Sequence, residues 1–85
     1  MSIMYYILIR EKGVKIMVYK VILSEGEDGY IVAECPAIAG CISQGKTLPE
    51  ALQNIKEAIE LALECYKEEG KPIPEDHTKV EEIAV

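Results

Sequence analysis

The sequence predicts one small α+β domain with the element order β-β-β-α-β, in which a single helix covers one face of a short sheet. Three observations lead to this prediction. The chain has only 85 residues, 49% of them hydrophobic, so it can build one core and no more. Two stretches on either side of an acidic turn have the alternation and the residue types of β-strands. A long amphipathic stretch follows, and glycine and proline end it.

The first two predicted strands form a hairpin. Val18 to Leu23 is rich in β-branched residues and carries apolar side chains on both faces, which is typical of a central strand. The turn from Ser24 to Gly29 contains two glycines, which adopt positive φ without strain. Tyr30 to Cys35 is the second strand. Pro36 ends it because proline has no N–H to donate to a neighbouring strand.

A shorter third strand and a fourth complete the predicted sheet. Cys41 to Gln44 lies between Gly40 and Gly45, and its assignment as a strand depends mainly on those two glycines. After the helix, Thr78 to Val85 alternates in the mixed way of an edge strand. A right-handed crossover through the helix would place this last strand parallel to a neighbour, in an otherwise antiparallel meander.

The helix is the element with the clearest signals. Thr47 is a suitable N-cap, and Glu50 three residues later completes a capping box. Pro49 is tolerated in the first turn, where its missing N–H would have no partner inside the helix. Gly70 ends the helix as a left-handed cap. Between these two caps, apolar residues recur at intervals of three and four along one stripe: Leu48, Ala51, Leu52, Ile55, Ala58, Ile59, Ala62, Leu63 and Tyr66.

Leu61 and Cys65 lie away from the centre of that stripe, on one flank of the helix. Two interpretations stay open for them. Single exposed apolar residues are ordinary on protein surfaces. Alternatively, this flank meets a second subunit or a partner protein, because two apolar residues one turn apart widen the buried face beyond what a small sheet covers.

Residues 1–16 form an N-terminal extension to a domain that covers residues 17–85, and two interpretations of the extension stay open. Met4 to Ile9 has the composition of an extra strand that could turn near Gly13 and pair with the first. Alternatively, translation starts at Met17, because Gly13-Val14 can be encoded by GGAGTN, which resembles a ribosome-binding sequence just upstream of that codon.

The charge balance excludes some classes of function. The formal net charge is −6, so a phosphate backbone would be repelled, and we expect no direct nucleic-acid binding by this chain alone. No apolar run approaches the length of a membrane span, and no secretion signal leads the chain, so we expect a cytoplasmic protein. The three cysteines, Cys35, Cys41 and Cys65, suit a reducing compartment as free thiols, although Cys35 and Cys41 could lie close enough to oxidise.

Catalytic and metal sites are not predicted. The single histidine, His77, stands in a proline-flanked connection with no serine or cysteine nucleophile beside it in the sequence. One histidine with scattered carboxylates does not make a metal site, and no glycine-rich phosphate loop occurs. We therefore expect no enzymatic activity and no cofactor.

The chain resembles the HicB antitoxin family over about residues 17 to 85. The resemblance rests on an ordered set of short motifs: Tyr19 to Leu23, Asp28-Gly29-Tyr30, Pro36 to Cys41 with Ser43, Gly45 and Thr47, Glu50-Ala51, Glu57 to Glu60, and Gly70 to Glu75. It implies a β-β-β-α-β fold related to a truncated RNase H, without catalytic residues. It also implies an antitoxin that binds and blocks a small basic mRNA interferase of the HicA type. Many members continue into a DNA-binding domain, so this chain, which stops at Val85, is expected not to repress an operator by itself.

The expected function is that of a protein-binding module that occludes a basic toxin, and a homodimer or higher oligomer is expected because the domain is small. The alternative is a stand-alone oligomeric or ligand-sensing module on the same fold with no toxin partner. Candidate contacts to the toxin are the carboxylates of the turn and of the polar helix face: Glu25, Glu27, Asp28, Glu57, Glu60 and Glu64.

Overall fold

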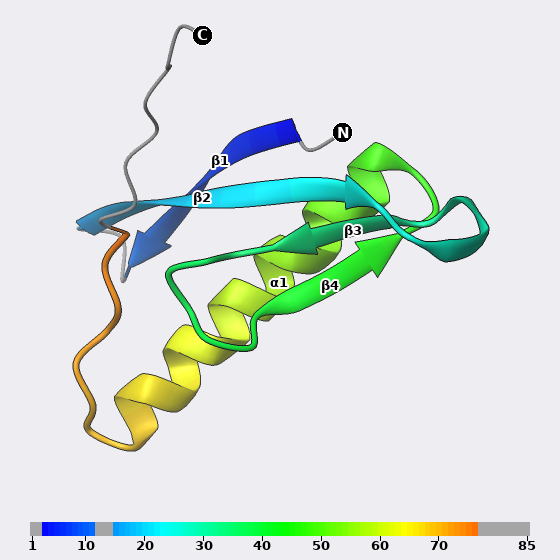
Figure 1. The fold of residues 1–85 in the computed structure, drawn as a ribbon. Helices are drawn as coiled ribbons and strands as arrows, with labels where there is room; N and C mark the ends of the chain where they lie inside the picture. The colour runs from blue at the N-terminus through cyan, green and yellow to red at the C-terminus, as the bar shows by residue number, and fades with distance from the viewer. Residues whose placement is uncertain (1–2, 12–14, 77–85) are drawn as a thin grey trace, which may run out of the picture.

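The computed structural model describes residues 3–11 and 15–76 (Figure 1). Four strands form one sheet in the order β1-β2-β3-β4, and every neighbouring pair is antiparallel. The helix α1 lies across one face of this sheet, and a short 3₁₀ turn, η1, joins the second and third strands. The element bounds are β1 Ile3–Glu11, β2 Lys15–Glu25, η1 Glu27–Gly29, β3 Ile31–Glu34, β4 Ile42–Gly45 and α1 Leu48–Glu68.

These elements confirm the α+β class, the helix on one sheet face and the central position of the strand that contains Val18 to Leu23, which is part of β2. The N-terminal stretch is a strand that pairs with β2 along its whole length, from Ile3 opposite Leu23 to Glu11 opposite Lys15. The predicted parallel last strand is not supported. The described sheet is wholly antiparallel, and Thr78 to Val85 lies outside the described residues.

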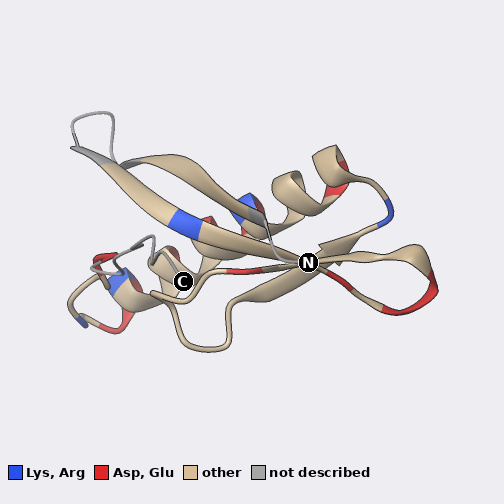
Figure 2. Ribbon diagram, turned by 45° about the horizontal axis from the view of Figure 1, so that its top comes forward, with Lys and Arg blue, Asp and Glu red and all other residues tan. Residues whose placement is uncertain are grey.

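The turn between β2 and β3, at one end of the sheet, contains several acidic residues (Figure 2). Gly26 donates its backbone N–H to the carbonyl of Tyr30 at 2.8 Å, which closes the turn. Asp28 and Gly29 both have positive φ inside it, at 56° and 78°. Aspartate and glycine tolerate this left-handed conformation better than most residues, so the local sequence explains the turn.

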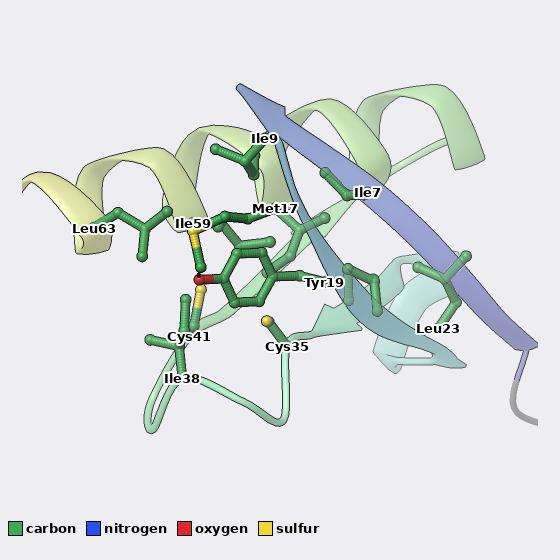
Figure 3. Close-up of a cluster of buried hydrophobic side chains, with 13 residues drawn as sticks. Ile7, Ile9, Met17, Tyr19, Leu23, Cys35, Ile38, Cys41, Ile59 and Leu63 are labelled. Carbon is green, nitrogen blue, oxygen red and sulfur yellow. Dashed lines mark hydrogen bonds between the residues drawn. The ribbon is translucent and has the colours of Figure 1, made fainter. Parts of the chain in front are cut away.

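The core lies between the sheet and α1, and strand alternation places its residues (Figure 3). In β2 every second side chain points to the helix and is buried: Met17, Tyr19, Val21 and Leu23. The largest side chains with no exposed surface include Tyr19, Ile55 and Ile59, so the ring of Tyr19 packs under the middle of the helix. The remaining buried residues of the cluster are Ile7, Ile9, Ala33, Cys35, Ile38, Cys41 and Leu63.

The two helix ends are capped by local interactions. Thr47 accepts a hydrogen bond at its Oγ1 from the Glu50 N–H at 3.3 Å, as predicted. The other half of the predicted capping box is wrong, because Glu50 Oε1 accepts from the Lys46 N–H instead of the Thr47 N–H. At the C-terminus Gly70 has φ 69°, and the Lys71 N–H reaches back to the Tyr66 carbonyl at 2.9 Å, which is a Schellman motif.

Gly45 and Gly40 meet two different requirements at β4. A Cβ on Gly45 would lie 2.4 Å from the backbone nitrogen of Ala51, so only glycine lets the first turn of the helix rest on the strand. Gly40 has φ 76° in the connection that follows Pro36, whose side chain is exposed. The amide of Asn54 donates to the carbonyl of Gln44 at 2.8 Å and joins the second helical turn to the same strand.

The segment after the helix returns to the middle of β2. The Tyr19 hydroxyl donates a hydrogen bond to the carbonyl of Pro74, and the carboxylate of Asp76 accepts the backbone N–H of Lys20 at 2.6 Å. The ammonium of Lys20 lies 3.8 Å from the same carboxylate. These contacts place residues 74–76 beside β2, at the level where β3 has already ended at Glu34.

Candidate partner-binding surface

An apolar groove of about 260 Å³ runs between one flank of α1 and the connection from β3 to β4. The helix contributes small or apolar side chains at helical spacing, and the connection contributes Ile38 to Cys41. Ile42, the first residue of β4, also lines the groove. The helix side is formed by Ala58, Leu61, Ala62 and Cys65.

Two residues at this groove expose far more apolar surface than an interior position would. Leu61 keeps 63% of its surface exposed and Ile42 keeps 58%. They are 19 positions apart in sequence, and the packing of α1 on β4 brings them to one groove. A groove with exposed apolar walls on a small protein is typical of a protein-binding site, because burying those walls against a partner is favourable.

Carboxylates follow the other side of Leu61 along the helix. Residues three and four apart on a helix are neighbours, so Glu57 and Glu64 lie next to Leu61, away from Ala58 and Cys65. Glu60 lies further round on the same side, and all three glutamates are exposed. Leu61 therefore stands at the border between the apolar groove and an acidic stripe, which consists of Glu57, Glu60 and Glu64.

The second predicted group of contacts, Glu25, Glu27 and Asp28, lies elsewhere. These residues are exposed at the β2–β3 turn, at the end of the sheet where the helix begins (Figure 2). The acidic stripe starts about two and a half turns further along the helix. The structure thus brings Leu61, Cys65 and the acidic stripe together, and keeps the turn apart from them.

Sequence reasoning missed the other half of the groove. Ile38, Gly40, Cys41 and Ile42 line it, and none of them was a candidate contact. The sequence contains only a weak indication that Ile42 binds a partner, namely that an apolar residue occupies an outward position of a short strand. Only the helix packing showed that it belongs with Leu61.

The thiols divide into two kinds. Burial raises the pKa of Cys35 to about 11, with a smaller contribution from the neighbouring Cys41, and burial also raises the pKa of Cys41. Both are therefore protonated small apolar residues of the core at neutral pH. Cys65 is an exposed free thiol at the rim of the groove.

Two other features are absent from residues 3–11 and 15–76. No group of three or more histidine, cysteine or acidic side chains is arranged there to hold a metal ion. Within the same ranges, no helix combines the length and the apolarity needed to cross a bilayer.

Comparisons with known proteins agree with the resemblance seen in the motifs. A UPF0150 protein of Thermoplasma acidophilum is 51% identical over 69 residues, which are 81% of this chain and 97% of that protein. A UPF0150 protein of Synechocystis is 43% identical over 67 residues, 79% of this chain and 85% of its own length. No solved structure matches. The sequence model of the HicB-like antitoxin of bacterial toxin-antitoxin systems matches residues 19–85, and the chain therefore belongs to the HicB-like antitoxin family.

Proposed function

We propose that this protein is an antitoxin that binds a small, basic, HicA-like mRNA interferase and covers the surface with which that toxin acts on RNA. Membership of the family supports a toxin as the partner. The observation that carries the proposal is the apolar groove at Leu61 and Ile42, bordered by the acidic stripe. An apolar groove beside carboxylates fits a partner that presents an apolar side chain within a basic surface.

The two parts of this surface contribute differently to binding. The carboxylates of the acidic stripe attract a basic partner over several ångströms and orient it before contact. The groove then receives an apolar anchor, and the loss of water from Leu61 and Ile42 keeps the complex together. We infer that the turn carboxylates, Glu25, Glu27 and Asp28, act through steering, since they lie apart from the groove.

The protein acts here as a binding module and not as an enzyme. A toxin whose RNA-binding surface is covered cannot reach its substrate, so neutralisation requires contact and no bond breaking. A chain with free thiols suits the cytoplasm, where such a toxin meets mRNA.

The test begins with the product of the neighbouring gene. If that gene encodes a small basic protein, the two chains are expressed together and purified through a tag on one. RNA cleavage by the toxin is then measured with increasing amounts of this protein. We expect a stable complex and complete inhibition at a fixed stoichiometry.

Two variants and two matched controls locate the surface. We expect Leu61→Ser to weaken binding by about tenfold or more, because a buried apolar anchor contact is lost. We expect Glu64→Gln to weaken it by less, since one exposed charge contributes little. Val18→Ser, an apolar-to-serine change, and Glu34→Gln are the controls, at exposed positions on the sheet face away from the helix.

Equal affinity of Leu61→Ser and the unaltered protein would contradict the groove as the contact. A complete failure of the two chains to bind would contradict the antitoxin role itself and would favour the stand-alone module.

A further inference from the structure

β1 is an edge strand that extends the sheet beyond the family-matched part of the chain. The match begins at residue 19, whereas β1 spans Ile3–Glu11. Among the residues that the structure describes, only β2 pairs with it. From Ile3 to Ile9 this strand has no charged residue and no proline. It therefore lacks the usual sequence features that keep an edge strand from pairing with another chain.

One hydrogen bond shows which backbone groups of β1 point away from β2. The Lys20 N–H donates to Asp76, so it points away from β1. Lys20 stands opposite Tyr6, and this pair is consequently of the type whose N–H and C=O groups point away from each other. The outward donors and acceptors of β1 therefore belong to Tyr6 and, two residues on either side, to Met4 and Leu8.

The same three residues expose their side chains on the sheet face away from the helix. Tyr6 keeps 61% of its surface exposed, and Met4 and Leu8 are exposed as well. Val18, opposite Leu8 on β2, extends this apolar patch. On the helix side of β1 an open groove of about 290 Å³ lies between the strand and α1, lined by Tyr5 to Leu8, Pro49, Leu52, Gln53 and Lys56.

We propose that this edge pairs with β1 of a second copy, antiparallel, across a two-fold axis at Tyr6. In this register Tyr6 faces Tyr6 of the other copy, and Met4 faces Leu8, so each outward N–H meets a carbonyl. The two sheets become one continuous sheet with both helices on the same side. The grooves beside the two copies of β1 then open toward each other. They receive the side chains that the two paired strands direct to the helix side of the sheet.

Charge selects a second copy over a basic partner at this strand. The chain has a net charge of −6, and its turn and acidic stripe repel another copy. The stretch from Ile3 to Ile9 is neutral, so two copies can approach there without that repulsion. A basic toxin is drawn to the carboxylates instead.

The dimer goes beyond the proposed function and does not depend on it. The groove at Leu61 adjoins β4, which is the opposite edge of the sheet from β1. A dimer through β1 therefore leaves both copies of that groove open.

The experiment measures the mass of the full chain in solution by sedimentation equilibrium, from about 1 to 100 μM. We expect a dimer. Tyr6→Lys and Tyr6→Glu each place two like charges directly opposite across the axis, and each variant alone should raise the dimer dissociation constant by about tenfold or more. An equimolar mixture should recover the dimer as a mixed species, because opposite charges then face each other. Circular dichroism checks that each variant is folded.

Val18→Lys is the matched control, because it adds the same charge to the same sheet face, on β2 instead of β1. It should leave the dimer intact. A monomeric unaltered chain, a dimer that survives Tyr6→Lys, or a mixture that stays monomeric would each overturn the proposal. Loss of the dimer in Val18→Lys would also overturn it, since the sheets would then pack face to face. Failure of toxin binding alone would leave these masses unchanged.

Discussion

The hydroxyl of Tyr19 donates a hydrogen bond to the backbone carbonyl of Pro74, 55 residues later in the chain. The Tyr19 ring is fully buried under α1, and its hydroxyl also lies 3.8 Å from the sulfur of Met17. The segment after the helix is thereby held against the middle of the sheet. The buried Tyr19 hydroxyl thus has its hydrogen-bond partner in the backbone near the end of the described chain. Burial of this ring and the position of the segment that contains Pro74 therefore depend on each other.

Tyr19→Phe tests this link. The ring remains, but the Pro74 carbonyl loses its donor, so we expect the free energy of unfolding to fall by about 1 to 2 kcal/mol. Urea unfolding at one fixed protein concentration measures it. Tyr30→Phe removes the hydroxyl of a half-exposed ring at the β2–β3 turn and should change the stability little. Equal stability of both variants and the unaltered protein would show that the Tyr19 hydroxyl contributes nothing.

Gly45→Ala should be costly for a different reason. The added Cβ would lie 2.4 Å from the Ala51 nitrogen and 2.8 Å from the Glu50 carbonyl carbon, and both are backbone atoms that cannot rotate away. We expect a loss of about 2 to 3 kcal/mol as the helix start moves off β4. Gln44→Ala, at the exposed neighbouring position, is the control. A melting temperature of Gly45→Ala equal to that of the control would contradict the close packing.

The thiols should differ sharply in reactivity. At pH 7.5 we expect an alkylating reagent to modify the exposed Cys65 within minutes and to leave Cys35 and Cys41 unmodified until the protein unfolds. Mass spectrometry after timed quenching counts the modified thiols. Rapid labelling of three thiols in the folded protein would contradict the burial of two of them.

The raised pKa of Cys35 also predicts a dependence of stability on pH. Its folded pKa of about 11 is above the ordinary 9.0, so the folded state favours the protonated thiol. This stabilisation is fully present below pH 9 and is lost as the pH rises through 11. Unfolding at pH 8, 10 and 11 should show a fall that is smaller in Cys35→Ala. Identical falls in both proteins would assign the effect to other groups.

Association with a basic toxin should weaken with salt. Raising the ionic strength from about 0.05 to 0.5 M should lower the association rate by about tenfold or more, with a smaller effect on dissociation. Surface plasmon resonance separates the two rates. Replacing Glu57, Glu60 and Glu64 by glutamine should flatten this dependence, and the same change at Glu25, Glu27 and Asp28 shows how much the turn adds. An association rate of the unaltered protein that does not change with salt concentration would exclude electrostatic steering.

Local signals predicted the helix and the hairpin well. Thr47 and Gly70 cap the helix as expected, because a cap depends on residues within a few positions of it. The partner of Glu50 was predicted one residue away from its true partner, Lys46, since side-chain rotamers decide between adjacent N–H groups. The N-terminal strand stayed ambiguous because the groups that β1 bonds to lie up to 20 residues away along the chain.

The proposed binding surface was only half predictable for the same reason. The carboxylates and the flank of Leu61 and Cys65 follow from helical periodicity, which is a property of nearby residues. Ile42 joins them only when the helix packs across β4. No pattern within either segment indicates that these two exposed side chains border one groove.

Local sequence signals are enough to specify an amphipathic capped helix and a hairpin with an acidic turn, and the composition specifies a net charge of −6. Propensity, capping and charge are set by residues close together in the chain. Three features follow only from tertiary packing: among the described residues β1 pairs with β2 alone, Tyr19 donates to Pro74, and Leu61 and Ile42 line one groove. Each depends on contacts between distant segments, which form only when the apolar faces are buried against one another.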